Sequence, residues 1–293
     1  MYPASFEYLA PSGVNEAIAL LQQYGEDAKL LAGGQSLVPM MKLRLARPRY
    51  LIDLNRIPNL NAIREQRGHI YVGAMTRHVE IEDSSLIREK LPMLCEAARQ
   101  IADTQVRNRG TLGGSLAEAD PSGDWGPVAL ALKAEMKCVG PKGERRIAAA
   151  DFFTFAYTSA LESQEILTEV IFPVPGAESA GVYVKLESVA GAFAIVSAAV
   201  QVGLDENGTC QTIGIGVTGR GAVPEQAIAI ENLLKGKKIT PELIDQAGRL
   251  IQEGADPIED MRGSAHYKKK ALSAILRRAL NEGLRRAQDG RSS

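Results

Sequence analysis

AGGQS at residues 32–36 and TLGGS at residues 111–115 are the two segments from which the fold of this chain is inferred. Each carries a glycine pair closely followed by a serine, and the first comes directly after an apolar run. Glycine lets the backbone approach a ligand and adopt positive φ, so that successive N–H groups point into one concavity. A tight turn would explain either segment alone. Because there are two, we favour a backbone cradle for a diphosphate group.

Two common nucleotide-binding motifs do not fit these segments. Neither reads Gly-x-Gly-x-x-Gly, and neither reads Gly-x-x-x-x-Gly-Lys-Ser/Thr. A Rossmann dinucleotide fold and a P-loop nucleotidase are therefore both disfavoured.

Composition narrows the class of protein further. The chain has 293 residues, 45% hydrophobic and 24% charged, which suggests about two globular domains. The formal net charge of -1 argues against a nucleic-acid partner. Cys95, Cys138 and Cys210 lack metal-ligand spacing, so we expect no metal site and no iron–sulfur cluster on this chain. No secretory signal and no apolar run of about 18 residues is visible, so we expect a cytoplasmic protein without a transmembrane segment.

The first part of the chain mixes helices and strands. A helix is expected to begin with Ser12 as its cap and to end at Gly25. A helical region is expected over about 79–102, and a helix after Pro121 that begins near Trp125. A further helix at 37–45 and strands at 29–32, 50–54, 69–73, 135–139 and 165–172 complete the expectation.

The composition changes at residues 173–177, where prolines and a glycine predict a linker. Strands are expected at 181–187, 194–203 and 211–218, with a hairpin turn at 205–208 joining the last two. Three helices follow, and the middle one should begin with Thr240 as its cap and Pro241 at its first position. Its inward face is expected to carry Leu243, Ile244, Ala247, Leu250 and Ile251. The fold class is therefore α+β.

At this point the chain resembles a known family. AGGQSLVPMMKLRLARPRYLIDL at 32–54, followed by VRNRGTLGGSLAEADPSGD at 106–124, is similar to the FAD-binding medium subunit of molybdenum hydroxylases. That family includes bacterial carbon monoxide dehydrogenase flavoproteins and the flavin domain of xanthine dehydrogenase. The resemblance implies a two-part FAD-binding domain of the vanillyl-alcohol oxidase type over 1–176, with subdomains at about 1–55 and 56–176. A small α+β domain of antiparallel strands and helices would follow over 177–293.

The resemblance also implies a function. FAD would be held non-covalently and would serve electron transfer within a heterotrimeric oxidoreductase. A large subunit would carry the molybdenum cofactor, a small subunit would carry [2Fe–2S] clusters, and an external acceptor would receive the electrons. No catalytic residue would lie on this chain. A stand-alone flavin oxidoreductase of the same fold and a flavin-free scaffold subunit are the alternatives.

Carried over by position, the resemblance assigns cofactor-binding residues. Asp124 would lie near the sugar or linker hydroxyls, and Lys185 close to the flavin ring. Ile166 and Leu167 would contact the adenine, and Phe193 would pack beside the flavin. The diphosphate would be held by Ala32, Gly33, Gly34, Gln35, Ser36 and Leu37 on one side, and by Thr111, Gly113, Gly114 and Ser115 on the other.

Three further residues bear on the flavin environment. Two positions depart from the family pattern. The stretch Ser188–Phe193 lacks the basic residues that many relatives carry before an acid or large aromatic, and Phe193 cannot hydrogen-bond to the flavin; Glu118 stands where a histidine is common. His78 could be a covalent flavin anchor, but the family binds FAD non-covalently, so we expect a structural or surface histidine. Trp125 is expected in the core.

Overall fold

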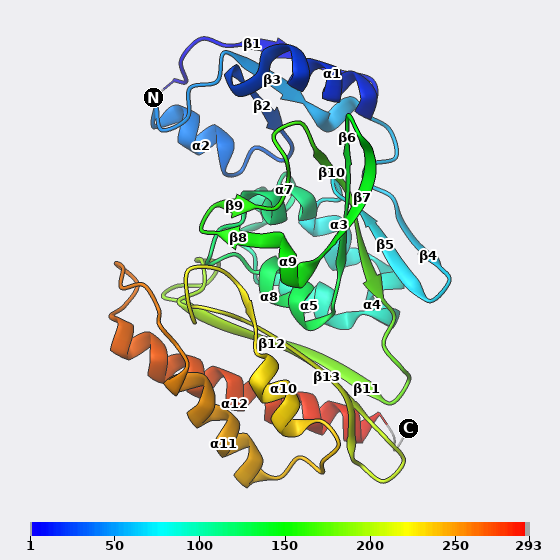
Figure 1. Ribbon diagram of the computed structural model, residues 1–293, viewed down its shortest axis with the longest axis vertical. Coiled ribbons are helices and arrows are strands. Elements are labelled where there is room, and N and C mark those ends of the chain that lie inside the picture. The colour runs from blue at the N-terminus through cyan, green and yellow to red at the C-terminus, as the bar shows by residue number, and fades with distance from the viewer. Residues whose placement is uncertain (1, 291–293) are drawn as a thin grey trace.

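The computed structural model describes residues 2–290. The three larger β-sheets follow one another along the long axis of the molecule, with helices packed between and below them (Figure 1). This mixed architecture confirms the expected α+β fold class. Within residues 2–290, no helix combines the length and the apolar character that crossing a bilayer requires.

The first sheet is small and parallel. Its strands are β1 (Glu7–Leu9), β2 (Ala28–Leu31) and β3 (Tyr50–Asp53), in the order β1-β3-β2. Helices α1 (Val14–Tyr24) and α2 (Leu37–Lys42) accompany it. The predicted cap was wrong: Gly13 is the N-cap of α1, whereas Ser12 donates from its amide and its hydroxyl to Glu16. The predicted end at Gly25 is confirmed.

The second sheet is antiparallel and has the order β4-β5-β10-β6-β7. The helical region expected over about 79–102 is not one helix. Ser84 caps a new helix by accepting from the Ile87 amide, and Pro92 begins another. The sheet contains β4 (Ile63–Gln66), β5 (His69–Gly73), β6 (Glu135–Gly140), β7 (Gly143–Ala148) and β10 (Ile166–Pro173), and β8 (Phe153–Phe155) pairs with β9 (Thr158–Ser159) beside it. The helices are α3 (His78–Asp83), α4 (Ser85–Lys90), α5 (Pro92–Arg99), α6 (Thr104–Arg107), α7 (Leu112–Glu118), α8 (Trp125–Ala131) and α9 (Ala149–Phe152).

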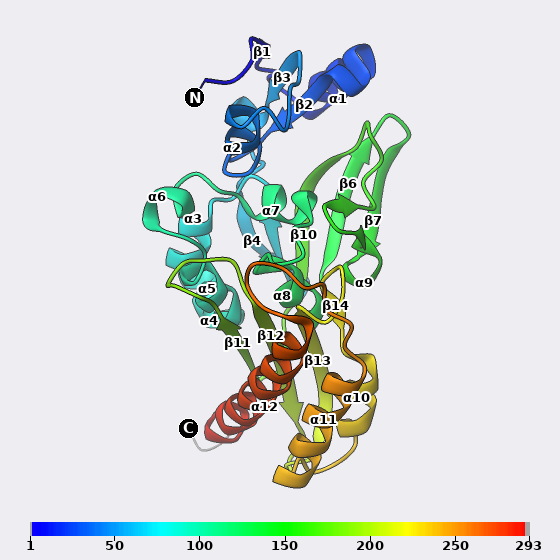
Figure 2. The same cartoon turned by 90° about the vertical axis from the view of Figure 1, so that its left-hand side faces the viewer.

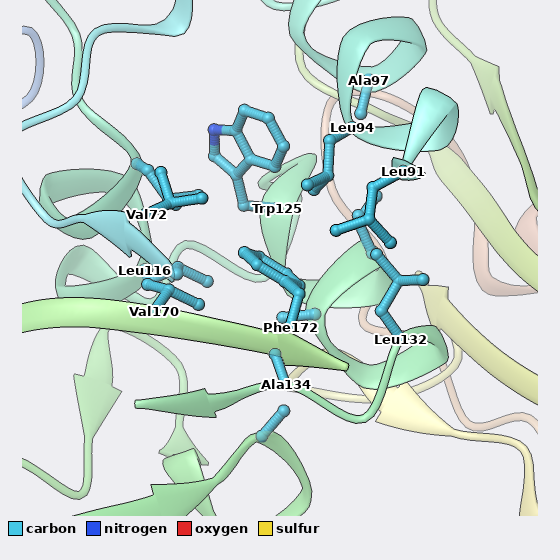
Figure 3. Close-up of a cluster of buried hydrophobic side chains, with 14 of the residues drawn as sticks. Val72, Leu91, Leu94, Ala97, Leu116, Trp125, Leu132, Ala134, Val170 and Phe172 are labelled. Atoms are coloured by element: carbon cyan, nitrogen blue, oxygen red, sulfur yellow. The ribbon is translucent and has the colours of Figure 1, made fainter. Parts of the chain in front are cut away.

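The core of this middle part is built around Trp125, as predicted. Its indole is 1% exposed and lies near Leu94 and Phe172 (Figure 3). The same hydrophobic cluster includes Tyr183 and Ala199 from the third sheet. The middle and last parts of the chain therefore share one apolar interface.

The third sheet is antiparallel, with the order β11-β12-β13-β14. Helix α12 (Ala265–Asp289) packs on β11 and β12 (Figure 2), and Gly283 lies over Val182 and Val200. Thr240 caps α11 (Pro241–Glu253) as expected, but Leu250 is 37% exposed, so its predicted inward position was wrong. The remaining elements are β11 (Ser179–Leu186), β12 (Val196–Leu204), β13 (Cys210–Thr218), β14 (Glu225–Gln226) and α10 (Ile228–Leu234).

Candidate functional site

A cleft of about 510 Å³ lies where the first sheet meets the second. Helix α2 lies above α7 in both views of the molecule (Figures 1 and 2). Residues at the start of each helix line the cleft. All of the residues predicted to bind the cofactor line this cleft except Lys185: Ala32, Gly33, Gly34, Gln35, Ser36, Leu37, Thr111, Gly113, Gly114, Ser115, Asp124, Ile166, Leu167 and Phe193.

The first glycine loop joins β2 to α2. Gly34 has φ +75°, a conformation that side chains with a Cβ rarely adopt. Among residues 2–290, the amides of Gly34, Gln35 and Ser36 donate to no acceptor. These free N–H groups line the cleft and are suited to an anionic ligand.

The second glycine loop begins α7. The Thr111 hydroxyl accepts from the Gly114 amide at 3.1 Å, which makes Thr111 the N-cap. The Gly113 amide donates to the Ala74 carbonyl oxygen at 2.8 Å, and a Cβ at Gly113 would lie 2.4 Å from the Ala74 Cβ. Glycine at 113 is therefore required by close packing on β5 and its extension.

The two loops touch each other. A Cβ at Gly33 would lie 2.3 Å from the Arg109 carbonyl oxygen, and a Cβ at Gly114 would lie 3.3 Å from the Ala32 Cβ. The glycines are thus needed for the approach of one loop to the other. The sequence suggested only their role in ligand binding.

Asp124 forms part of the cleft wall, and Lys185 lies behind it. The Lys185 ammonium is fully buried, 3.1 Å from an Asp124 carboxylate oxygen and 3.0 Å from Glu187. It also donates to the Gln100 and Ala192 carbonyl oxygens at 2.7 and 2.9 Å. Two of these partners, Asp124 and Ala192, line the cleft, so the ammonium supports the cleft wall from behind.

The Asp124 carboxylate has a second partner. The Tyr183 hydroxyl donates to it at 2.7 Å. Burial raises the pKa of Asp124 above its ordinary value, while the Lys185 charge and the Tyr183 hydrogen bond oppose that rise. The result is a carboxyl group held in one orientation at the cleft surface.

His78 also lines the cleft, and its environment is structural. The Trp125 indole N–H donates to His78 Nδ1 at 3.2 Å, and the imidazole is 4% exposed. Burial, followed by the Arg77 and Arg107 charges, lowers the pKa of His78 to about 4. The ring is therefore neutral near pH 7, which suits the expected structural role.

The departures from the family pattern both face the cleft. Burial and the neighbouring Asp120 raise the pKa of Glu118. Phe193 is 49% exposed at the opposite side, with the Arg262 guanidinium 5.6 Å from its ring centroid. Ile166 and Leu167, at the start of β10, add an almost fully buried apolar wall.

Several residues that contribute to the cleft were missed by the sequence reasoning. Met75, Ala117 and Gly123 line it, and their only sequence signal is adjacency to predicted site residues or strands. Asn55 and Arg77 lie behind the glycine loops and bond to the backbone of each. No motif marks these two residues. In residues 2–290, no group of histidine, cysteine and acidic side chains could hold a metal ion.

These features fit FAD. Free backbone amides and two closely packed glycine loops match the needs of a diphosphate, and the apolar wall at Ile166 and Leu167 matches an aromatic ring system.

Comparisons with known proteins agree. The chain matches the family model "FAD binding domain in molybdopterin dehydrogenase" over residues 4–175 and "CO dehydrogenase flavoprotein C-terminal domain" over residues 182–283. It is 41% identical to the carbon monoxide dehydrogenase medium chain of Hydrogenophaga pseudoflava, over 96% of this chain and 98% of that one. It is 37% identical to the 6-hydroxypseudooxynicotine dehydrogenase complex subunit alpha of Paenarthrobacter nicotinovorans, over 100% and 99% of the two chains.

A solved structure gives the same result for the fold. Carbon monoxide dehydrogenase from Hydrogenophaga pseudoflava, in a form lacking the Mo-pyranopterin moiety of its cofactor, matches with a TM-score of 0.95 and 42% identity. The match covers 98% of this chain and 99% of that chain. The chain therefore belongs to the family of FAD-binding medium subunits of the molybdenum hydroxylases, and is an oxidoreductase subunit.

Proposed function

We propose that this chain holds FAD non-covalently in the cleft between its first two sheets and transfers electrons within a larger complex. The observation that carries the proposal is the direct contact of two glycine loops, the first of which has free backbone amides, in the cleft lined by the predicted site residues. FAD, when bound, supplies redox chemistry that no side chain of this protein can supply.

We assign the chain's residues as follows. The loop at 32–37 holds the diphosphate through its free backbone N–H groups and the Ser36 hydroxyl. The loop at 111–115 forms the second wall and contributes the Ser115 hydroxyl. Ile166 and Leu167 contact the adenine, and Phe193 packs beside the flavin. Asp124 binds hydroxyls of the sugar or linker, and Lys185 orients Asp124 from behind. We also propose that the FAD-binding domain ends near residue 176.

The proposed partners follow from the kind of protein that the relatives are. Relatives of almost the same length are called a medium chain and a complex subunit. We infer a large subunit with the molybdenum cofactor, a small subunit whose [2Fe–2S] clusters reduce the flavin, and an external electron acceptor. The buried Cys95, Cys138 and Cys210 of this chain are too far apart in sequence to offer such a cluster a binding motif.

The test is purification of the full-length chain from cells that produce it, with whatever chains accompany it. We expect a yellow protein whose flavin is released as FAD by acid denaturation, together with a large chain and an iron-containing small chain. A colourless preparation that takes up no FAD in a titration would overturn the assignment. Substrate turnover by the chain alone would favour a stand-alone flavin oxidoreductase.

A further inference from the structure

A series of hydrogen-bonded polar side chains lies behind the two glycine loops. Asn55 follows β3 and uses both ends of its amide. Its Nδ2 donates to the Ala32 carbonyl oxygen of the first loop at 2.9 Å, and its Oδ1 accepts from Arg77 Nη2. Neither Asn55 nor Arg77 lines the cleft. The pair therefore acts on the loops from outside.

The other arm of Arg77 reaches the second loop. Its Nη1 donates to the carbonyl oxygen of Arg109, which is the same oxygen that lies against Gly33. The backbone of Arg77 pairs with Thr111 in an isolated β-bridge, and its amide donates to Glu80 at 2.6 Å. The backbone of Arg77 is thus fixed by Thr111 and Glu80, while its guanidinium holds the Arg109 carbonyl in position.

Asp53 fixes the orientation of the Asn55 amide. One carboxylate oxygen accepts from the Asn55 backbone N–H at 2.9 Å and from Asn55 Nδ2, and the other accepts from the Tyr8 hydroxyl at 2.5 Å. Burial alone would raise the pKa of Asp53, but the hydrogen bonds from Tyr8 and Asn55 and the Arg109 charge outweigh it, so the pKa lies below its ordinary value. Asp53 is therefore ionised and acts only as an acceptor.

We propose that Asn55 and Arg77 form a strut that sets the spacing of the two glycine loops, and that they are positioning residues for the FAD diphosphate. The identity of the ligand rests on the proposed function above. The first loop follows β2 of the first sheet, whereas the second begins α7 and packs beside β5 of the second sheet, so their spacing depends on contacts between them. The Asn55 amide can donate to Ala32 and accept from Arg77 at once, and the planar Arg77 guanidinium donates in two fixed directions.

Two substitutions test the strut with little change in size. Asn55→Asp keeps an acceptor for Arg77 but cannot donate to Ala32, and it adds a negative charge next to Asp53. Arg77→Lys keeps the positive charge but cannot reach Asn55 and Arg109 together. Asn207→Asp, in the turn between β12 and β13, and Arg67→Lys, in the turn between β4 and β5, are matched controls outside the cleft.

The measurement is the Kd for FAD of the deflavinated full-length protein, purified with its accompanying chains. We expect each strut variant to bind FAD about 10- to 100-fold more weakly, because each loses a hydrogen bond that connects the two loops. Both variants break the same connection. The Kd of the double variant should therefore be at most about twofold higher than the Kd of whichever single variant binds FAD less tightly. ADP, which carries the diphosphate, should lose affinity by the same factor, whereas riboflavin, which lacks it, should not. The controls should bind all three compounds normally.

Two results would overturn the strut. One is a wild-type Kd in both variants, and the other is a pair of effects that multiply in the double variant. An equal loss of riboflavin and ADP binding would indicate general damage to the fold, and this result would also count against the strut. If Asn55→Asp does not fold, Arg77→Lys decides alone. A wild-type protein that binds no FAD would contradict the proposed function, whereas normal FAD binding by the variants would contradict only the strut.

Discussion

Acid should destabilise this protein through His78. The imidazole is 4% exposed, accepts from the Trp125 indole N–H through Nδ1, and has a pKa of about 4. An unfolded histidine has a pKa of about 6.5. Because the folded pKa is the lower one, the stability from neutral His78 is present above about pH 6.5 and is lost as the pH falls towards 4.

The magnitude follows from the two pKa values. Between pH 7 and pH 5, the unfolded chain takes up a proton at this position and the folded chain does not, which costs about 2 kcal/mol of unfolding free energy. Nδ1 of a protonated ring can no longer accept, so the Trp125 N–H would also lose its partner.

Urea unfolding at pH 7 and pH 5 measures this effect. Trp125 is the only tryptophan, so its fluorescence reports on the same hydrogen bond. His78→Gln, which keeps an acceptor that does not titrate, should lose about 2 kcal/mol less than wild type over this pH range. His69→Gln is the control, because His69 lies exposed on β5. Equal pH dependence in wild type and His78→Gln would refute the reasoning.

Three further predictions concern the cleft. Gly33→Ala should weaken FAD binding strongly in a flavin titration, because the new Cβ would lie 2.3 Å from the Arg109 carbonyl oxygen; normal FAD affinity would show that the loops can move apart. Lys185→Met should cost about 3–5 kcal/mol of unfolding free energy in urea, because Asp124 would remain as an unpaired buried charge. Adding Asp124→Asn should recover part of that loss, and a double variant as unstable as the single one would contradict the pairing. Thr111→Ala should lower the free energy of unfolding by about 1 kcal/mol in the same assay, because the α7 cap is lost. Thr111→Ser should retain most of the capping stability, and an equal loss in both variants would exclude capping as the cause.

Local chemistry explains why many elements could be predicted. The end of α1 at Gly25, the cap of α11 at Thr240 and the hairpin turn at 205–208 depend on residues close in sequence. Failures arose where a side chain had a competing partner or where tertiary packing decided. Ser12 bonds to Glu16 from a position before the cap, and the helical region at 79–102 is divided by Ser84 and Pro92.

From the sequence alone it was possible to predict which segments line the cleft. Two glycine loops identify a backbone cradle because glycine's conformational freedom is a property of the residue. The contacts of Asn55 and Arg77 with the loops, and that of Lys185 with Asp124, become visible only in the folded chain. These contacts join residues 22 to 61 positions apart. No local pattern encodes such pairings, since each depends on how the sheets pack in three dimensions.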